Sequence, residues 1–144
     1  MADDRFSVRV HVSAMDDASV IQQALQAWLG EVEIERNAYA SHAGPTMLTL
    51  SVDLRRKADL RFAWAGLEDG SLNTLLGDMG DRLDDEAGLH FRVDLDHLVA
   101  GRVTLAPPGA SRSAKVRCKV AVYPGQTAEG RLREMIEAAL KQTR

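Results

Sequence analysis

The sequence predicts an α+β fold in which three helices cover one face of a mainly antiparallel sheet. The observation behind this is that segments alternating apolar with polar residues, typical of half-buried strands, occur between segments whose apolar residues follow a helical stripe. Hydrophobic residues make up 45% and charged residues 27% of the 144-residue chain, as in soluble globular proteins. The length suits one domain, residues 1–144.

The chain is predicted to begin with a strand and a helix. Residues 5–13, RFSVRVHVS, alternate polar and apolar side chains, which indicates a strand with one buried face. Residues 19–30, SVIQQALQAWLG, place their apolar side chains on one helical stripe, and Gly30 ends the helix. Three further strands are predicted in EVEIERNAYA (31–40), TMLTLSVDL (46–54) and ADLRFAWAG (58–66).

The second helix is predicted in residues 67–88, LEDGSLNTLLGDMGDRLDDEAG, with Ser71 as its N-cap. Gly77 and Gly80 should weaken this helix by up to about 1 kcal/mol each relative to alanine. They therefore either permit close packing of a neighbouring element or leave the helix locally soft.

The remaining segments predict three strands and a third helix. The strands lie in LHFRVDLDHL (89–98), GRVTLAP (101–107) and AKVRCKVAVY (114–123), and Thr127 caps the last helix. The predicted order is β-α-β-β-β-α-β-β-β-α. Residues 15–20 match residues 67–72 in chemical type, so the order is compatible with an internal βαββ duplication.

The sheet face away from the helices is predicted to be open and to carry charges of both signs. We expect a partner to bind there or along a free strand edge. The predicted contact residues on or near this face are Arg5, Arg9, His11, Glu31, Glu33, Glu35, His90, Arg92, Asp94, Lys115, Arg117 and Lys119.

The segment LHFRVDLDHL contains the residues most suggestive of chemistry. In an extended strand His90 and His97 lie on opposite faces and roughly 20 Å or more apart, too far for one zinc ion with bonds of about 2 Å. A small metal-dependent hydrolase built around His90, Asp94 and Asp96 stays an alternative, but a solvated strand face is favoured. Cys118 falls in register with valines and is read as a core residue. Without a catalytic motif, we expect no enzyme and no cofactor.

Nucleic acid is considered as a second alternative. The net charge of −3 offers no general attraction to phosphate, although Lys115, Arg117 and Lys119 form a local basic face. The strand alternation predicts that Phe6, Phe62 and Trp64 point inward, which leaves few rings for base stacking. The glutamates of EVEIERN are placed to neutralise the cations across the sheet. Nucleic-acid binding is therefore expected to be unlikely.

The localisation expected from the sequence is cytoplasmic. No apolar run reaches the roughly 18 residues that a membrane-spanning helix needs. The start, MADDRFSVRV, is acidic where a signal peptide would be basic and then apolar.

Three segments, ASVIQQALQAWLG, ADLRFAWAGLEDGSLNTLLGDMG and AKVRCKVAVYPGQTAEGRLREMIEAALKQ, follow an order of elements that resembles the class I type III secretion chaperones. This resemblance implies a cytoplasmic homodimer that wraps an unfolded protein segment, with the second helix as the dimerisation element. The function expected from the sequence is thus a non-catalytic protein-binding module, either a secretion chaperone or an inhibitor or immunity protein.

Overall fold

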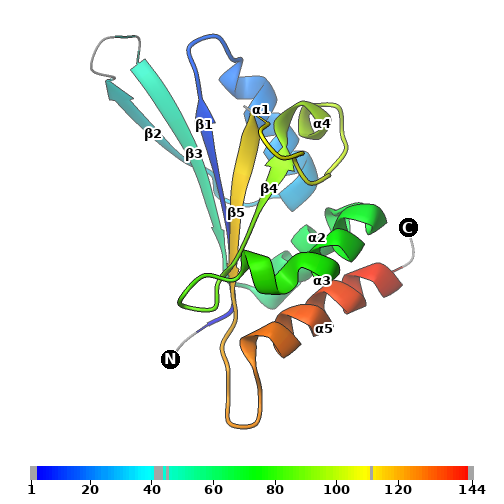
Figure 1. Cartoon of the computed structure of the whole chain (residues 1–144). Helices are drawn as coiled ribbons and strands as arrows, with labels where there is room; N and C mark the ends of the chain where they lie inside the picture. Colours follow the sequence, from blue (N-terminus) through cyan, green and yellow to red (C-terminus); the bar gives the residue numbers. More distant parts are fainter. Residues whose placement is uncertain (1–2, 41–43, 45, 111, 143–144) are drawn as a thin grey trace.

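The molecule has two layers, a five-stranded antiparallel sheet and a set of helices on one side of it (Figure 1). The structure is a computed structural model and describes residues 3–40, 44, 46–110 and 112–142. In these residues the strand order across the sheet is β2-β3-β1-β5-β4. The strands are β1 (Arg5–Val12), β2 (Glu35–Ala40), β3 (Thr46–Leu54), β4 (Leu89–Asp94) and β5 (Ser113–Lys119). The helices are α1 (Ala18–Leu29), α2 (Lys57–Gly66), α3 (Asp69–Arg82), α4 (Leu95–Val99) and α5 (Ala128–Lys141).

The predicted α+β class and the antiparallel sheet with helices on one face are confirmed. One hydrophobic cluster lies between the two layers, and Phe6 of β1 is at its centre. The Phe6 ring meets Trp28, Trp64 and Phe91 edge-on, at centroid distances of 5.9, 5.3 and 6.3 Å. Such pairs add stabilisation beyond the burial of their area, so these rings join the sheet to α1 and α2.

The segment ADLRFAWAG was predicted to be a strand, and this is wrong: it lies within helix α2. Leu60, Ala63 and Trp64 are buried, which is a helical spacing that an alternating pattern hides. The segment also contains three alanines, which favour helix over strand. As a consequence Phe62, expected to point inward, has 54% of its side-chain surface exposed.

Two other predicted strands are shorter than expected or absent. In EVEIERNAYA only Glu35–Ala40 forms β2, while Val32 and Ile34 pack on the core from the preceding loop. GRVTLAP forms only isolated bridges, Val103 with Leu67 and Leu105 with Val93. In LHFRVDLDHL the strand stops at Asp94, whose carboxylate accepts a hydrogen bond from the His97 amide and caps the short helix α4.

The second unit of the proposed βαββ duplication is not formed, because it needs a strand where α2 lies. The cap predicted at Thr127 is confirmed, since its hydroxyl accepts from the Gly130 amide. Ser71 is not an N-cap: α3 begins after Glu68, and the Ser71 hydroxyl accepts from the Leu105 amide.

Helix α3 contains the two glycines expected either to permit close packing or to weaken the helix. A side-chain carbon added at Gly77 or Gly80 would have no heavy atom within 4 Å. The glycines therefore serve no close contact with a described neighbour, and the local softness of the helix stays a prediction.

Among the helices described, none has the length and hydropathy needed to cross a lipid bilayer.

Candidate functional site

The outer face of the sheet carries three basic side chains in one line across three strands. Arg9 of β1 lies opposite Lys115 of β5, and Lys115 lies opposite Arg92 of β4. All three side chains are exposed because their positions alternate with buried neighbours on each strand. We call Arg9, Lys115 and Arg92 the cation row.

The cation row has no acidic partner among the described residues. Within residues 3–40, 44, 46–110 and 112–142, no carboxylate lies within 4.0 Å of Arg9, Arg92 or Lys115, and none of the three has a side-chain hydrogen bond. Like charges directly opposite one another destabilise a sheet. The arrangement is thus unfavourable for the isolated protein and would be relieved by an anion bound along the row.

The cations next to this row are neutralised. Arg5 forms an ion pair with Asp53 at 2.9 Å, and Lys119 forms one with Glu86 at 3.3 Å. The Asp84 carboxylate is 3.0 Å from Arg117 Nε and 2.6 Å from His90 Nε2. The face is therefore divided into a paired part around Asp84 and the unpaired cation row.

Asp84 also organises the loop between α3 and β4. Its Oδ1 accepts hydrogen bonds from the Gly88 amide at 2.8 Å and the Glu86 amide at 2.9 Å. The hydrogen bond from Arg117, followed by those from the Gly88 amide and His90, holds the pKa of the Asp84 carboxyl well below its usual range. A side chain at Gly88 would meet the Arg117 guanidinium at 2.7 Å, so this position needs glycine for Arg117 to reach Asp84.

Two shallow grooves meet at the cation row. The first, of about 440 Å³, runs over the central strands and includes Arg9 and Lys115 in its lining. The second, of about 850 Å³, includes Arg92 and Lys115 and extends past β4 to Pro107 and Pro108. Since Lys115 and His90 line both, the two grooves are continuous across β5 and β4.

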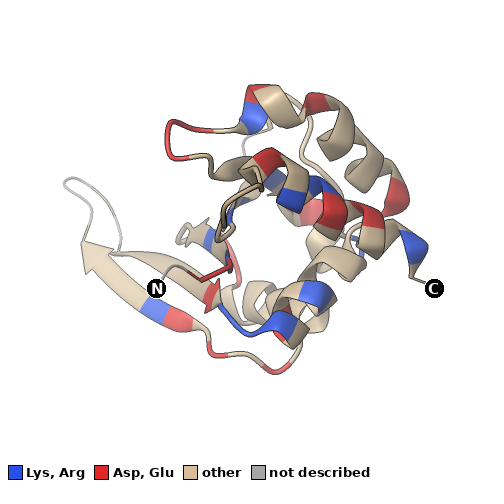
Figure 2. Cartoon of the chain, turned by 90° about the horizontal axis from the view of Figure 1, so that it is seen from below, with Lys and Arg blue, Asp and Glu red and all other residues tan. Residues whose placement is uncertain are grey.

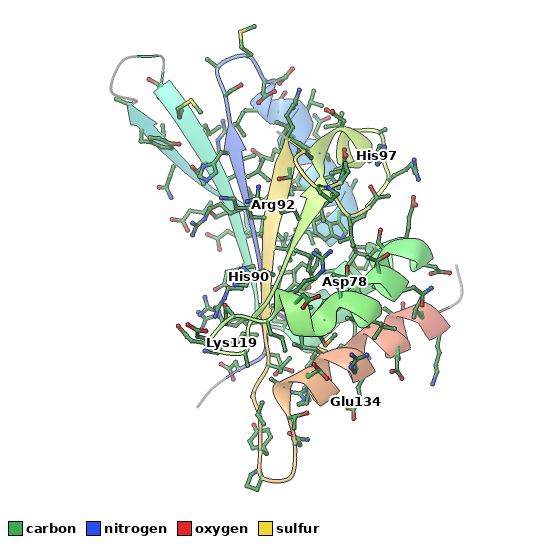
Figure 3. The ribbon with its side chains drawn as sticks, viewed as in Figure 1. Asp78, His90, Arg92, His97, Lys119 and Glu134 are labelled. Atoms are coloured by element: carbon green, nitrogen blue, oxygen red, sulfur yellow. The ribbon has the colours of Figure 1, made fainter. Side chains whose placement is uncertain are left out.

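Figure 3 shows where the labelled charged residues lie. His90, Arg92 and Lys119 are on the side of the sheet that the helices leave uncovered, whereas His97 lies on α4 and Glu134 lies on α5. His97 Nδ1 is 2.7 Å from the Thr104 hydroxyl and takes no part in the outer face.

The other predicted contact residues are spread around this site. His11 Nδ1 is 3.1 Å from the Thr49 hydroxyl, and Glu35 begins the edge strand β2, opposite Ser51. Glu31 and Glu33 lie in the loop before β2 and not on a strand. The glutamates of EVEIERN were expected to neutralise the basic strand, and this is wrong because β3 and β1 stand between β2 and β5. Asp84 and Glu86 instead neutralise Arg117 and Lys119 of that strand.

The metal-site alternative is not assembled by the fold. His90 bonds to Asp84, Asp94 caps α4 and Asp96 lies on α4 itself. Among the residues described, no group of three histidine, cysteine or acidic side chains is placed to hold a metal ion. Cys118 is buried, and burial raises the pKa of its thiol well above the usual value.

Two features of the site were missed by the sequence analysis. The role of Asp84 was not predicted, and the sequence signal for it is only that Asp84 precedes Gly88 by four residues and His90 by six. Arg82 lines the second groove, and its Nε is buried without a hydrogen-bond partner in the described part of the chain.

A family model described as RNA binding matches residues 5–121. No curated protein matches the chain.

Several solved structures share the fold. A DUF54 protein from Archaeglobus fulgidus has a TM-score of 0.77 at 22% identity, covering 93% of this chain and 99% of its own. A DUF54 protein from Methanothermobacter thermautotrophicus has a TM-score of 0.70 at 21% identity, covering 95% and 97%. A UPF0201 protein from Methanococcus jannaschii has a TM-score of 0.65 at 7% identity, covering 96% and 95%.

These findings correct the function expected from the sequence. The resemblance to type III secretion chaperones is wrong, because the family match and the solved structures belong to a different group. The protein-binding module, chaperone or inhibitor, is overturned with it, and so is the expectation that nucleic acid is an unlikely partner. The homodimer was implied by that resemblance and loses its basis.

Proposed function

Because the chain belongs to the RNA-binding family whose model spans residues 5–121, we propose that it binds RNA through the open face of its sheet. The observation that carries this proposal is the cation row, three unpaired basic side chains aligned across β1, β5 and β4. Phosphate contacts supply most of the affinity of such proteins for nucleic acid, and unpaired cations are what they require.

The chemistry of the face favours recognition of the sugar-phosphate backbone. Ser7 and Ser51 flank the cation row, and the imidazole of His90 lies one row away on β4. Hydroxyls and imidazoles can exchange hydrogen bonds with phosphates and ribose hydroxyls. Among the residues described on this face, one is aromatic: Tyr39, on the edge strand β2.

We therefore propose that the sheet face contacts helical or otherwise structured RNA. Double-stranded RNA is read mostly through its phosphates and 2′-hydroxyls and needs no stacking platform. The two continuous grooves give the backbone a path from the central strands to the loop at Pro107 and Pro108. An RNA ligand also agrees with the cytoplasmic localisation expected from the sequence.

A charge-matched pair of variants tests this proposal. The first carries Arg9→Gln, Arg92→Gln and Lys115→Gln and so removes the cation row. The second carries Arg36→Gln, Arg102→Gln and Arg133→Gln, which removes the same charge from side chains that bond elsewhere, to Gln22, Glu68 and Glu129. Binding to a labelled RNA duplex is followed by fluorescence anisotropy at several salt concentrations.

We expect the first variant to bind the duplex on the order of 100-fold more weakly than the wild type, since three phosphate contacts are lost. The second variant should stay within a few-fold of the wild type. Equal losses in both variants would mean that only total charge matters, and the proposed interface would be wrong.

A further inference from the structure

We infer that the molecule has a second RNA contact, in which Phe62 of α2 stacks on an unpaired base and nearby cations hold the adjoining phosphates. This inference rests on the proposed RNA-binding function and adds a separate site formed by α1, α2 and the segment after α4. Its ligand is single-stranded RNA, in contrast to the structured RNA proposed for the sheet.

Phe62 is exposed to solvent on helix α2. Its neighbours Leu60, Ala63 and Trp64 are buried, and Phe62 points the other way with 54% of its surface exposed. The ring lies beside Gly30 at the end of α1, where an added side-chain carbon would come within 3.6 Å of it. Because Phe62 is not part of the core, the packing of the fold does not account for a large ring at this position.

The ring borders a groove of about 580 Å³. Its lining includes the apolar side chains of Trp28, Phe62, Leu98 and Val103, with alanines and glycines between them. The small residues leave the space open, and the volume is within the range of pockets that hold small organic groups. A nucleobase, flat and largely apolar on its faces, suits such a surface.

Among the described residues that line this groove, the charged one is Arg61, and none is acidic. Arg56 and Arg61 are exposed and have no ion pair or side-chain hydrogen bond in the part of the chain that the structure describes. Figure 2 shows basic residues following one another into α2, where Lys57 lies between these two arginines in the sequence.

A ring together with unpaired cations is the combination that single-stranded nucleic acid requires. Bases stack on aromatic rings whatever their identity, while Lys and Arg side chains follow the backbone. An apolar peptide would use the groove and the ring but would leave Arg56 and Arg61 without counter-charges. The charge therefore favours RNA as the occupant.

The test uses the full-length protein and a single-stranded oligouridine, with an RNA duplex as the second ligand. Phe62→Ala removes the ring, and Phe62→Leu keeps apolar bulk without it. Tyr123→Ala is the matched control, since Tyr123 is 58% exposed and lies in the loop after β5, away from the groove lining. Thermal melting confirms that each variant is folded.

We expect both Phe62 variants to bind the single strand on the order of tenfold more weakly. Tyr123→Ala should bind it like the wild type, and duplex binding should be unchanged in all three variants. With oligonucleotides containing 5-iodouridine, ultraviolet cross-linking of the wild type should map to the α2 peptide and disappear in Phe62→Leu.

Wild-type affinity for the single strand in both Phe62 variants, or cross-links confined to β1, β4 and β5, would overturn this inference. Duplex binding that depends on the cation row would leave the proposed function standing in that case. If the wild type binds neither RNA, both proposals fail together.

Discussion

The sheet face and the groove bordered by Phe62, here called the α2 groove, both present basic side chains that have no acidic partner among the described residues, and they differ in what accompanies those cations. The cation row of Arg9, Lys115 and Arg92 lies among serines and a histidine, whereas Arg61 lies beside an exposed phenylalanine and an apolar groove. The first set of groups suits the sugar-phosphate backbone and the second suits a base. The residues next to a cation thus decide which part of a nucleic acid that cation can recognise.

The same comparison explains how a chain with a net charge of −3 can bind RNA. Most surface cations described are held by carboxylates, as Arg5 is by Asp53 and Arg102 by Glu68. Such pairs contribute little to affinity for phosphate. Affinity for RNA depends on the local excess of positive charge at the two sites, and the net charge of the whole chain does not report that excess.

The largest effect is expected when both regions are changed at once. The cation-row triple variant combined with Phe62→Ala should bind an RNA duplex with a single-stranded extension on the order of 1,000-fold more weakly, because the losses at separate sites add as free energies. The measurement is a double-mutant cycle by anisotropy, repeated with extensions of increasing length. If even the longest extension gives the wild type no more affinity than the blunt duplex, the two regions do not bind one RNA together.

The salt dependence of RNA binding should distinguish the cation row from the α2 groove. Removing the cation row should make the plot of log affinity against log salt concentration shallower. The magnitude of its slope should fall by about 2 to 3, since each phosphate contact contributes about 0.7 to 0.9. Phe62→Leu removes no charge and should leave the slope unchanged while lowering the affinity for single strands. A parallel fall of the slope in both variants would remove the distinction between backbone and base recognition.

Acid should affect the paired part of the face more than the cation row. The pKa of Asp84 is lowered in the folded state, so its contribution to stability is complete above the ordinary pKa of about 4 and is lost as pH falls through the acid range. Asp84→Asn should therefore be less stable than the wild type at pH 7 and lose less stability between pH 6 and pH 3 in urea denaturation. Asp85→Asn, which changes an exposed neighbour without a described partner, should keep the wild-type dependence.

The smallest effect expected is a gain in stability. Lys115 is opposite a cation on both sides, so Lys115→Gln should raise the free energy of unfolding by a few tenths to about 1 kcal/mol while weakening duplex binding. Lys119→Gln, which gives up its ion pair with Glu86, should show no such gain. Urea denaturation at low salt measures both, and equal stability of Lys115→Gln and the wild type would mean that the row carries no repulsive strain.

The strands of the centre of the sheet could be predicted because one face of each is buried. Within the observed bounds of β1, β3 and β5, alternation gave the correct inward residues, including Cys118, whereas Val122 of the predicted strand 114–123 lies beyond β5 and is exposed. The α2 segment could not be assigned in this way because Leu60, Phe62 and Trp64 fit a period of two as well as Leu60, Ala63 and Trp64 fit a helix. The helix buries Ala63 and Trp64 together: Trp64 packs on Phe6 and Phe91 of the sheet, and the Ala63 carbonyl accepts a hydrogen bond from Trp28 Nε1 of α1.

The site was predicted only in part, for a related reason. Parity placed Arg9, Arg92 and Lys115 on the open face, but their alignment in one row depends on strand order and register, which the sequence does not contain. The neutralisation of Arg117 by Asp84 likewise depends on a loop conformation in which Ala87 has φ of 61°. The exposed ring of Phe62 was hidden by the error in α2.

The bond between Trp28 and Ala63 has a practical consequence. The chain contains two tryptophans, and both are buried, but Trp28 also lines the α2 groove whereas Trp64 does not. The indole of Trp28 is thus held in one orientation at the wall of the groove, and its ultraviolet emission is a built-in optical reporter of whatever enters. With Trp64→Phe as background, occupancy of the groove could be followed in real time on the unlabelled protein.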